Sequence, residues 1–158
     1  MITLIFTALS FVIMLVFLSV YIVHRGLPNS ISDTYYSTEK RWLFPLTIGL
    51  SVSLGAVPLF ELTDEPYKFL SFFIIGGILF VSSAPAFKEE LEGKVHSISA
   101  IIAGVSSLVW LILMNGFPIL AIVSIAIGTI DTKRIVFWTE VGLLSNIYYV
   151  LFILSFSA

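Results

Sequence analysis

The side chains that could do chemistry gather in one polar segment of the sequence, which runs from His24 to Arg41. Hydroxyls, a carboxylate and two phenols lie close together in its middle, and all of them can hydrogen-bond a ligand. Its eighteen residues are long for a connection between helices. Two interpretations are open. In one, Ser32 or Asp33 caps a short helix in an ordered loop at the membrane surface. In the other, the segment folds back under the helices and forms a polar site.

His96 is a second candidate, because imidazole can transfer protons near neutral pH. The acidic run Glu89-Glu90-x-Glu92 comes just before it and is typical of a solvated loop. We therefore expect His96 to begin a helix on the same side of the membrane as Asp33, and to contact Asp33. Such a pair would bind a ligand, transfer a proton or simply hold the polar segment in place.

Glu140 is the only carboxylate well inside an apolar segment, and an ionisable group at such a depth is a functional candidate by default. An ion pair with Lys133, Arg134 or Lys40 at the membrane boundary is an equally good interpretation. Asn146 either clamps two helices together or contacts a ligand. The catalytic candidates are Asp33, His96, Asp131 and Glu140. The candidates for ligand binding are Ser30, Ser32, Asp33, Tyr35, Tyr36, His96 and Asn146.

No metal site and no cofactor is expected. Cysteine is absent, and the only histidines, His24 and His96, do not form a His-x-x-x-His pair. The sequence also lacks a glycine-rich phosphate loop, a Gly-x-Ser-x-Gly motif and a His-Glu-x-x-His motif. Catalysis would therefore need a constellation of residues without a familiar motif.

The elements that must position these residues are membrane helices. Of the 158 residues, 58% are hydrophobic and only 11% are charged, whereas a soluble domain has about 25% charged residues. The mean hydropathy is +1.07. A soluble enzyme, a nucleic-acid-binding protein and a disordered chain are excluded. We expect an all-α fold, a polytopic membrane helix bundle with six transmembrane helices in a single domain, residues 1–158.

Six apolar segments can form these spans, since a crossing helix needs about 20 residues. The fifth is short and crosses only if Asp131 to Arg134 lie among the lipid headgroups. Small residues form stripes on the second, fourth and sixth segments, and these stripes should face the bundle interior. The stripe on the sixth segment includes Gly142 and Tyr149. The expected spans are residues 2–23, 42–62, 67–87, 96–114, 117–131 and 135–156.

The basic residues predict the orientation of the chain. With six spans, Lys68 alone falls on the side that carries the termini, and the other seven lysines and arginines fall on the opposite side. Short loops rich in Lys and Arg stay in the cytoplasm. We therefore expect an integral protein of a bacterial inner membrane with both termini extracytoplasmic.

The pattern Pro28-x-Ser-Ile-Ser-x-x-Tyr-Tyr36, between the first two spans, resembles a loop of uncharacterised small multi-pass membrane proteins from bacteria and their phages. The histidine that follows Val95 is similar to one in the same group. The resemblance covers about a quarter of the chain and implies a fold and a location, not an activity. A remote likeness to the alkaline ceramidase and adiponectin receptor superfamily implies a zinc site of three histidines, and this chain has only two histidines.

Three classes of function remain. The favoured one is a binding or accessory membrane protein whose polar pocket at the cytoplasmic face holds a lipid headgroup or a small ligand. The alternatives are an intramembrane hydrolase or transferase acting on lipid, and a small transporter or channel that uses Asn146 and Glu140. Membrane lipid is the expected partner, with a second copy of the chain or another membrane protein as further candidates and no nucleic acid.

Overall fold

The computed structural model describes residues 1–84 and 89–157, and within these ranges the chain forms helices and no strand. Two short 3-10 turns, η1 and η3, precede α4 and α7. The α-helices are α1 (Ile2–Arg25), α2 (Asp33–Ser37), α3 (Leu43–Glu61), α4 (Lys68–Ser83), α5 (Glu89–Asn115), α6 (Ile119–Ile130) and α7 (Ile135–Ser157); the turns are η1 (Glu65–Tyr67) and η3 (Thr132–Arg134).

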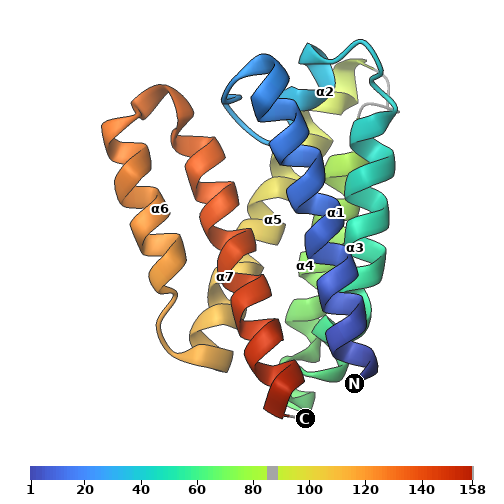
Figure 1. The fold of residues 1–158 in the computed structure, drawn as a ribbon, viewed down its shortest axis with the longest axis vertical. Helices are drawn as coiled ribbons and strands as arrows, with labels where there is room; N and C mark the ends of the chain where they lie inside the picture. Colours follow the sequence, from blue (N-terminus) through green and yellow to red (C-terminus); the bar gives the residue numbers. More distant parts are fainter. Residues whose placement is uncertain (85–88, 158) are drawn as a thin grey trace.

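The five long helices form a closed ring, in which α1 packs on α3, α3 on α4, α4 on α5, α5 on α7 and α7 on α1. The shorter α6 lies outside this ring and packs along α7 (Figure 1). Both termini lie at one end of the bundle, which we call the termini end (Figure 1). The opposite end carries α2 and η3, and we call it the loop end.

Five of the described helices, counting η1 and α4 as one span, are long and apolar enough to cross a membrane. The twelve-residue α6 covers about 18 Å at 1.5 Å per residue, which is less than the ~30 Å of a hydrocarbon core. The all-α helix bundle is thus confirmed, five of its helices could cross a membrane, and the fifth expected span, residues 117–131, is shorter than a full crossing.

Most of the helix boundaries lie within two residues of the expected spans. The end of the span expected at residues 67–87 falls partly outside the described residues. The clear error concerns α5, which begins at Glu89 rather than at His96. The acidic run that precedes His96 consists of good helix formers, and acidic residues are favourable in the first turn of a helix. The same sequence therefore extends the helix instead of forming a loop.

Small residues allow the closest contacts between helices. A Cβ atom added to Gly77 of α4 would lie 2.8 Å from the Ala103 Cβ atom of α5. A Cβ atom added to Gly142 of α7 would lie 2.6 Å from the Ser124 Cβ atom of α6. The predicted stripe on the last helix therefore faces α6 rather than the bundle interior. Its expected member Tyr149 is 47% exposed, and the neighbouring Tyr148 is the buried tyrosine.

Candidate functional site

The polar segment between α1 and α3 folds back onto the start of α7. The Phe137 amide donates a hydrogen bond to the Asn29 carbonyl oxygen (3.0 Å), and Arg134 Nε donates to the Leu27 carbonyl oxygen (3.2 Å). The Ile31 amide donates to Glu140 Oε2 (2.6 Å). The segment is therefore anchored at the loop end of the bundle, as the fold-back interpretation predicts.

Local hydrogen bonds give the segment its shape. Ser30 Oγ accepts a hydrogen bond from the Asp33 amide (3.1 Å) and bonds to Ser32 Oγ (2.9 Å). Thr34 Oγ1 donates to the Ile31 carbonyl oxygen (2.6 Å). Ser32 occupies the N-cap position of α2, as one of the two predicted caps, but its side chain makes no capping hydrogen bond, and the Ser30 hydroxyl accepts from the first amide of the helix instead. The hydroxyl of a serine can reach a free backbone amide that lies three residues later in the chain.

A cavity of about 110 Å³ lies between this segment and the ring of helices. Three of its lining residues have polar side chains, namely Ser32, Ser107 and Glu140. The remaining walls come from Ile31 of the polar segment and from α1, α3, α4, α5 and α7, and they are apolar apart from the backbone at Gly104. They are Met14, Ile31, Phe44, Ile48, Ile78, Val81, Ala100, Ala103, Leu143, Leu144 and Ile147. The site is thus an apolar cavity with a few polar groups rather than a polar pocket.

Glu140 is the carboxylate of this cavity. One oxygen, Oε2, accepts the hydrogen bond of the Ile31 amide. The other, Oε1, has no hydrogen-bond partner among the described side chains, those of residues 1–84 and 93–157, or among the described backbone. The ion pair expected with Lys133, Arg134 or Lys40 is not formed in the part of the chain that is described. A carboxylate oxygen beside an apolar cavity leaves an acceptor for a donor group of a ligand.

Arg134 is unavailable to Glu140 because it binds Asp131. Arg134 Nη1 lies 3.0 Å from Asp131 Oδ2, and the indole nitrogen of Trp138 donates to the same oxygen (3.3 Å). The hydrogen bond from Arg134 lowers the pKa of Asp131 below its ordinary value of 3.8. Asp131 therefore closes the turn between α6 and α7, and it does not line the cavity.

The expected contact between Asp33 and His96 is absent from the described structure: no hydrogen bond or ion pair joins them. The early start of α5 places His96 seven residues into the helix, and its half-buried side chain does not line the cavity. The rings of Tyr35 and Tyr36 pack edge to face with their centroids 5.0 Å apart, and Arg41 lies 5.9 Å from the Tyr35 ring centroid. Of the predicted polar residues in the segment, Ser32 alone lines the cavity.

Asn146 is a clamp between α7 and α6. Its side chain is completely buried, and its Oδ1 accepts hydrogen bonds from the amides of Leu120 (2.9 Å) and Ala121 (3.4 Å). These amides belong to the first turn of α6, where helix N–H groups have no partner within the helix. Asn146 Nδ2 has no hydrogen-bond partner in the described part of the chain. Of the two interpretations of this residue, the geometry matches the clamp.

Two buried hydroxyl clusters were missed by the sequence interpretation. In the first, Ser10 Oγ bonds to Tyr148 Oη (2.8 Å) and to the Ser51 carbonyl oxygen (2.7 Å). A serine in the middle of an apolar helix is the signal that could have indicated this contact, because a buried hydroxyl needs a partner.

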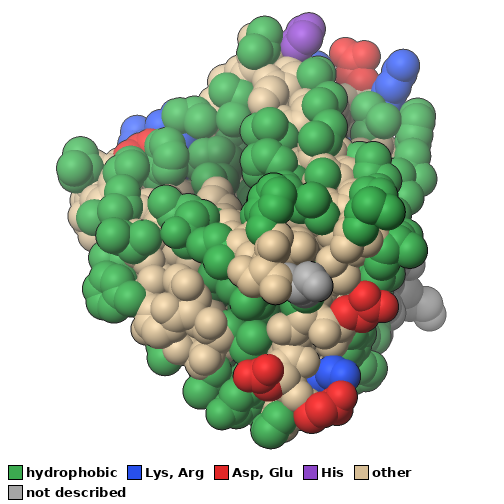
Figure 2. Space-filling model, turned by 60° about the horizontal axis from the view of Figure 1, so that its bottom comes forward, with side chains coloured by type: hydrophobic (Ala, Val, Ile, Leu, Met, Phe, Trp, Pro, Cys, Tyr) green, Lys and Arg blue, Asp and Glu red, His purple; other side chains and the backbone are tan. Residues whose placement is uncertain are grey.

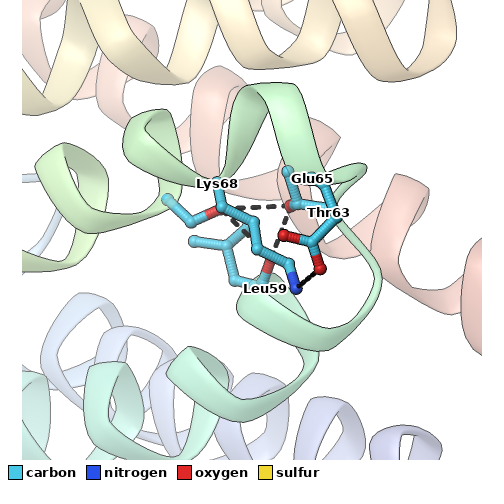
Figure 3. Close-up of polar contacts among 5 residues, drawn as sticks. Leu59, Thr63, Glu65 and Lys68 are labelled. Carbon is cyan, nitrogen blue, oxygen red and sulfur yellow. Dashed lines mark hydrogen bonds and ion pairs between the residues drawn. The ribbon is translucent and has the colours of Figure 1, made fainter.

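The second cluster lies at the termini end, around Thr63. Thr63 Oγ1 donates to the Leu59 carbonyl oxygen and accepts a hydrogen bond from Trp110 Nε1 (2.8 Å). Figure 3 shows Thr63 beside Leu59, with the ion pair of Lys68 and Glu65 next to them. This cluster ties α3, α4 and α5 together.

The sequence matches no protein-family model, and comparison with curated proteins and with solved structures gives no significant match either.

Proposed function

We propose that this protein is an integral membrane protein that binds a small amphiphilic ligand in the cavity at the loop end. The observation that carries the proposal is the Glu140 carboxylate, which lines an apolar cavity and keeps Oε1 unpartnered among the described residues. Ligand sites are commonly apolar, with a few polar groups that fix the orientation of the ligand. Of the three polar side chains that line the cavity, Glu140 is the one with an ionisable group.

The chemistry of the cavity limits the ligand. The unpartnered Glu140 Oε1 can accept a hydrogen bond, so the polar group of the ligand is a donor, such as a primary amine. The cavity volume of about 110 Å³ is of the order of the ~150 Å³ cavity that binds benzene in another protein. A ligand with a short alkyl or aromatic body and an amine therefore fits, as does the corresponding part of a lipid headgroup.

The arrangement of the catalytic candidates favours binding over catalysis. Within the described chain, no hydrogen bond or ion pair joins any two of Asp33, His96, Asp131 and Glu140. Only Glu140 lines the cavity. An enzyme would need at least two such groups around one reacting atom.

We further propose that the protein lies in a bacterial inner membrane, that α6 is a sixth crossing and that both termini are extracytoplasmic. The unequal distribution of basic residues in the sequence supports this orientation, because six spans place Lys68 on the side of the termini and the other seven lysines and arginines on the opposite side. The α6 helix runs antiparallel to α7, as a sixth crossing requires (Figure 1). The ligand cavity then opens near the cytoplasmic leaflet.

Thermal unfolding of the purified protein in detergent tests the ligand proposal with hexylamine, hexanol and hexanoate as probes. A ligand that binds only the folded state raises the midpoint of unfolding. We expect hexylamine to stabilise the protein more than hexanol, and hexanoate to give no stabilisation. Glu140→Gln should weaken hexylamine binding by about tenfold or more, because a charge-assisted hydrogen bond is lost.

Two further variants complete the test. Glu61→Gln changes an exposed carboxylate at the termini end and should bind hexylamine like the unmodified protein. Gly104→Leu keeps Glu140 but fills the cavity, and a Cβ atom at Gly104 has ordinary space, with Leu143 Cδ1 at 4.0 Å. Equal stabilisation of the Glu140→Gln and Glu61→Gln variants by hexylamine, or full binding by the filled variant, would contradict the proposal.

A further inference from the structure

A second concave surface lies on the lipid-facing side of α1 and α3, and it shares no lining residue with the central cavity. Its volume is about 770 Å³. The wall is apolar along α1, where Val12, Val16 and Val20 follow one another at the four-residue spacing of a helix face. We call this surface the α1–α3 groove.

The loop end of this groove is basic. His24, Arg25 and Lys40 line it there. Figure 2 shows histidine, basic and acidic side chains together at the top of the molecule, above a hydrophobic surface. An apolar wall with basic groups at one end matches the two parts of an anionic phospholipid, the acyl chain and the phosphate.

The other charges around the groove leave the basic groups available. Arg25 lies 3.8 Å from the Glu39 carboxylate, whose side chain is 93% exposed. Such an exposed pair is weak and can be replaced by a ligand. Lys40 makes no ion pair within the described residues. His24 Nδ1 is hydrogen-bonded to the Val20 carbonyl oxygen (2.8 Å), which leaves Nε2 for a ligand.

We propose that the α1–α3 groove binds one anionic phospholipid, with its phosphate at Arg25 and Lys40 and one acyl chain along Val20, Val16 and Val12. Any lipid chain can cover the apolar wall, since exposed apolar helices in a membrane are surrounded by lipid. Selection therefore comes from the headgroup, and the net positive charge of the groove end favours an anionic one. This binding site is independent of the ligand proposed for the central cavity.

Native mass spectrometry of the full chain in detergent, with phosphatidylglycerol and phosphatidylcholine of identical acyl chains as probes, tests the proposal. We expect one phosphatidylglycerol to bind in preference to phosphatidylcholine. Arg25→Gln/Lys40→Gln should lower the affinity for phosphatidylglycerol by about 25-fold, because each basic residue near an anionic headgroup contributes about a fivefold change. The affinity for phosphatidylcholine, whose choline offsets the charge of its phosphate, should fall less, so the preference for phosphatidylglycerol should be lost.

The matched control is Lys94→Gln/Lys133→Gln, which removes the same charge from exposed residues that do not line the groove. This control should keep the preference for phosphatidylglycerol. Val16→Trp leaves every charge in place and fills the groove, because Val16 is 54% exposed and lines its wall. It should lower the affinity for both lipids.

Four results would overturn the proposal. Equal binding of the two lipids would show that the headgroup charge is not recognised. An equal loss in the control would show that only the total charge matters, and unchanged binding to Val16→Trp would show that the groove is not used. A dimer that excludes the lipid would identify a second copy of the chain as the occupant.

Discussion

The two ends of the bundle bury polar groups in different ways. At the termini end, Thr63, Ser71 and Trp110 form a closed set of hydrogen bonds, with Ser71 Oγ 3.0 Å from Thr63 Oγ1 and 3.1 Å from the Leu59 carbonyl oxygen. At the loop end, Glu140 has one oxygen bonded to the Ile31 amide and one without a partner among the described residues.

This difference separates a structural cluster from a candidate ligand site. The hydroxyls and the indole of the closed cluster satisfy one another, so they contribute to stability and offer nothing to a ligand. An open acceptor beside a cavity contributes less to stability and can bind a donor. Each prediction below should therefore affect one end of the bundle and leave the other unchanged.

The largest effect on stability is expected for Trp110→Phe at the termini end. This change removes the donor to Thr63 and part of a side chain that is completely buried. It should lower the free energy of unfolding by about 1–3 kcal/mol, through the lost hydrogen bond and the space left behind. Chemical or thermal unfolding in detergent measures the change.

The same substitution at an exposed position is the control for Trp110→Phe. Trp42 is 58% exposed, so Trp42→Phe should alter the stability by less than about 0.5 kcal/mol. Binding of hexylamine at the loop end should be unaffected by either variant. A loss of hexylamine binding in Trp110→Phe, with the fold retained, would contradict the separation of the two ends.

An intermediate effect is expected for the anchoring of the polar segment by Glu140. Glu140→Leu removes the acceptor of the Ile31 amide, so this amide should exchange its hydrogen about tenfold faster. Glu140→Gln keeps a carbonyl oxygen there and should restore most of the protection. Hydrogen exchange followed by NMR or mass spectrometry measures both variants.

The termini end provides the comparison for this experiment. The amide of Leu62, which donates to the Pro58 carbonyl oxygen (2.9 Å), should exchange at the same rate in all variants. Unchanged exchange of Ile31 in Glu140→Leu would show that the other anchors, at Asn29 and Leu27, hold the segment without Glu140.

The sequence predicted the helices, because long apolar runs have direct physical consequences, and it offered the fold-back of the polar segment as one of two interpretations. It did not predict the partner of Glu140. The Ile31 amide lies 109 residues away in the sequence, and a sequence does not distinguish one backbone amide from another as a hydrogen-bond donor. The choice of Tyr149 over Tyr148 failed for a geometric reason. One residue changes the direction of a side chain on a helix by about 100°.

The errors at His96 and Asp33 have a different origin. A run of glutamates and lysines is favourable both as a solvated loop and as the start of a helix, so its composition cannot decide between them. The structure extends α5 to Glu89 and thereby moves His96 along the helix. The expected contact between His96 and Asp33 depended on a helix that begins at His96, so it is lost because α5 begins at Glu89.

The smallest effect is expected for the pH dependence of the turn between α6 and α7. The pKa of Asp131 is lowered from 3.8 by the hydrogen bond from Arg134. A carboxyl group whose pKa is lower in the folded state stabilises that state above its ordinary pKa. This contribution is lost as the pH falls from about 3.8 through the lower folded value. The indole N–H of Trp138, which donates to Asp131 Oδ2 (3.3 Å), reports the protonation by NMR.

We expect the Trp138 indole signal to shift with a midpoint below pH 3.8, and Asp131→Asn to abolish this shift. The indole signal of Trp42, which is exposed, should show no such transition and serves as the internal control. Because the ion pair is partly exposed, its contribution to stability should be small, and the closed cluster around Trp110 should not respond. A midpoint above 3.8, or a transition that persists in Asp131→Asn, would show that Arg134 does not hold Asp131 in the folded protein. The hydrogen bonds of the Ile31 amide to Glu140 and of the Phe137 amide to Asn29 would then anchor the polar segment on α7 without this ion pair.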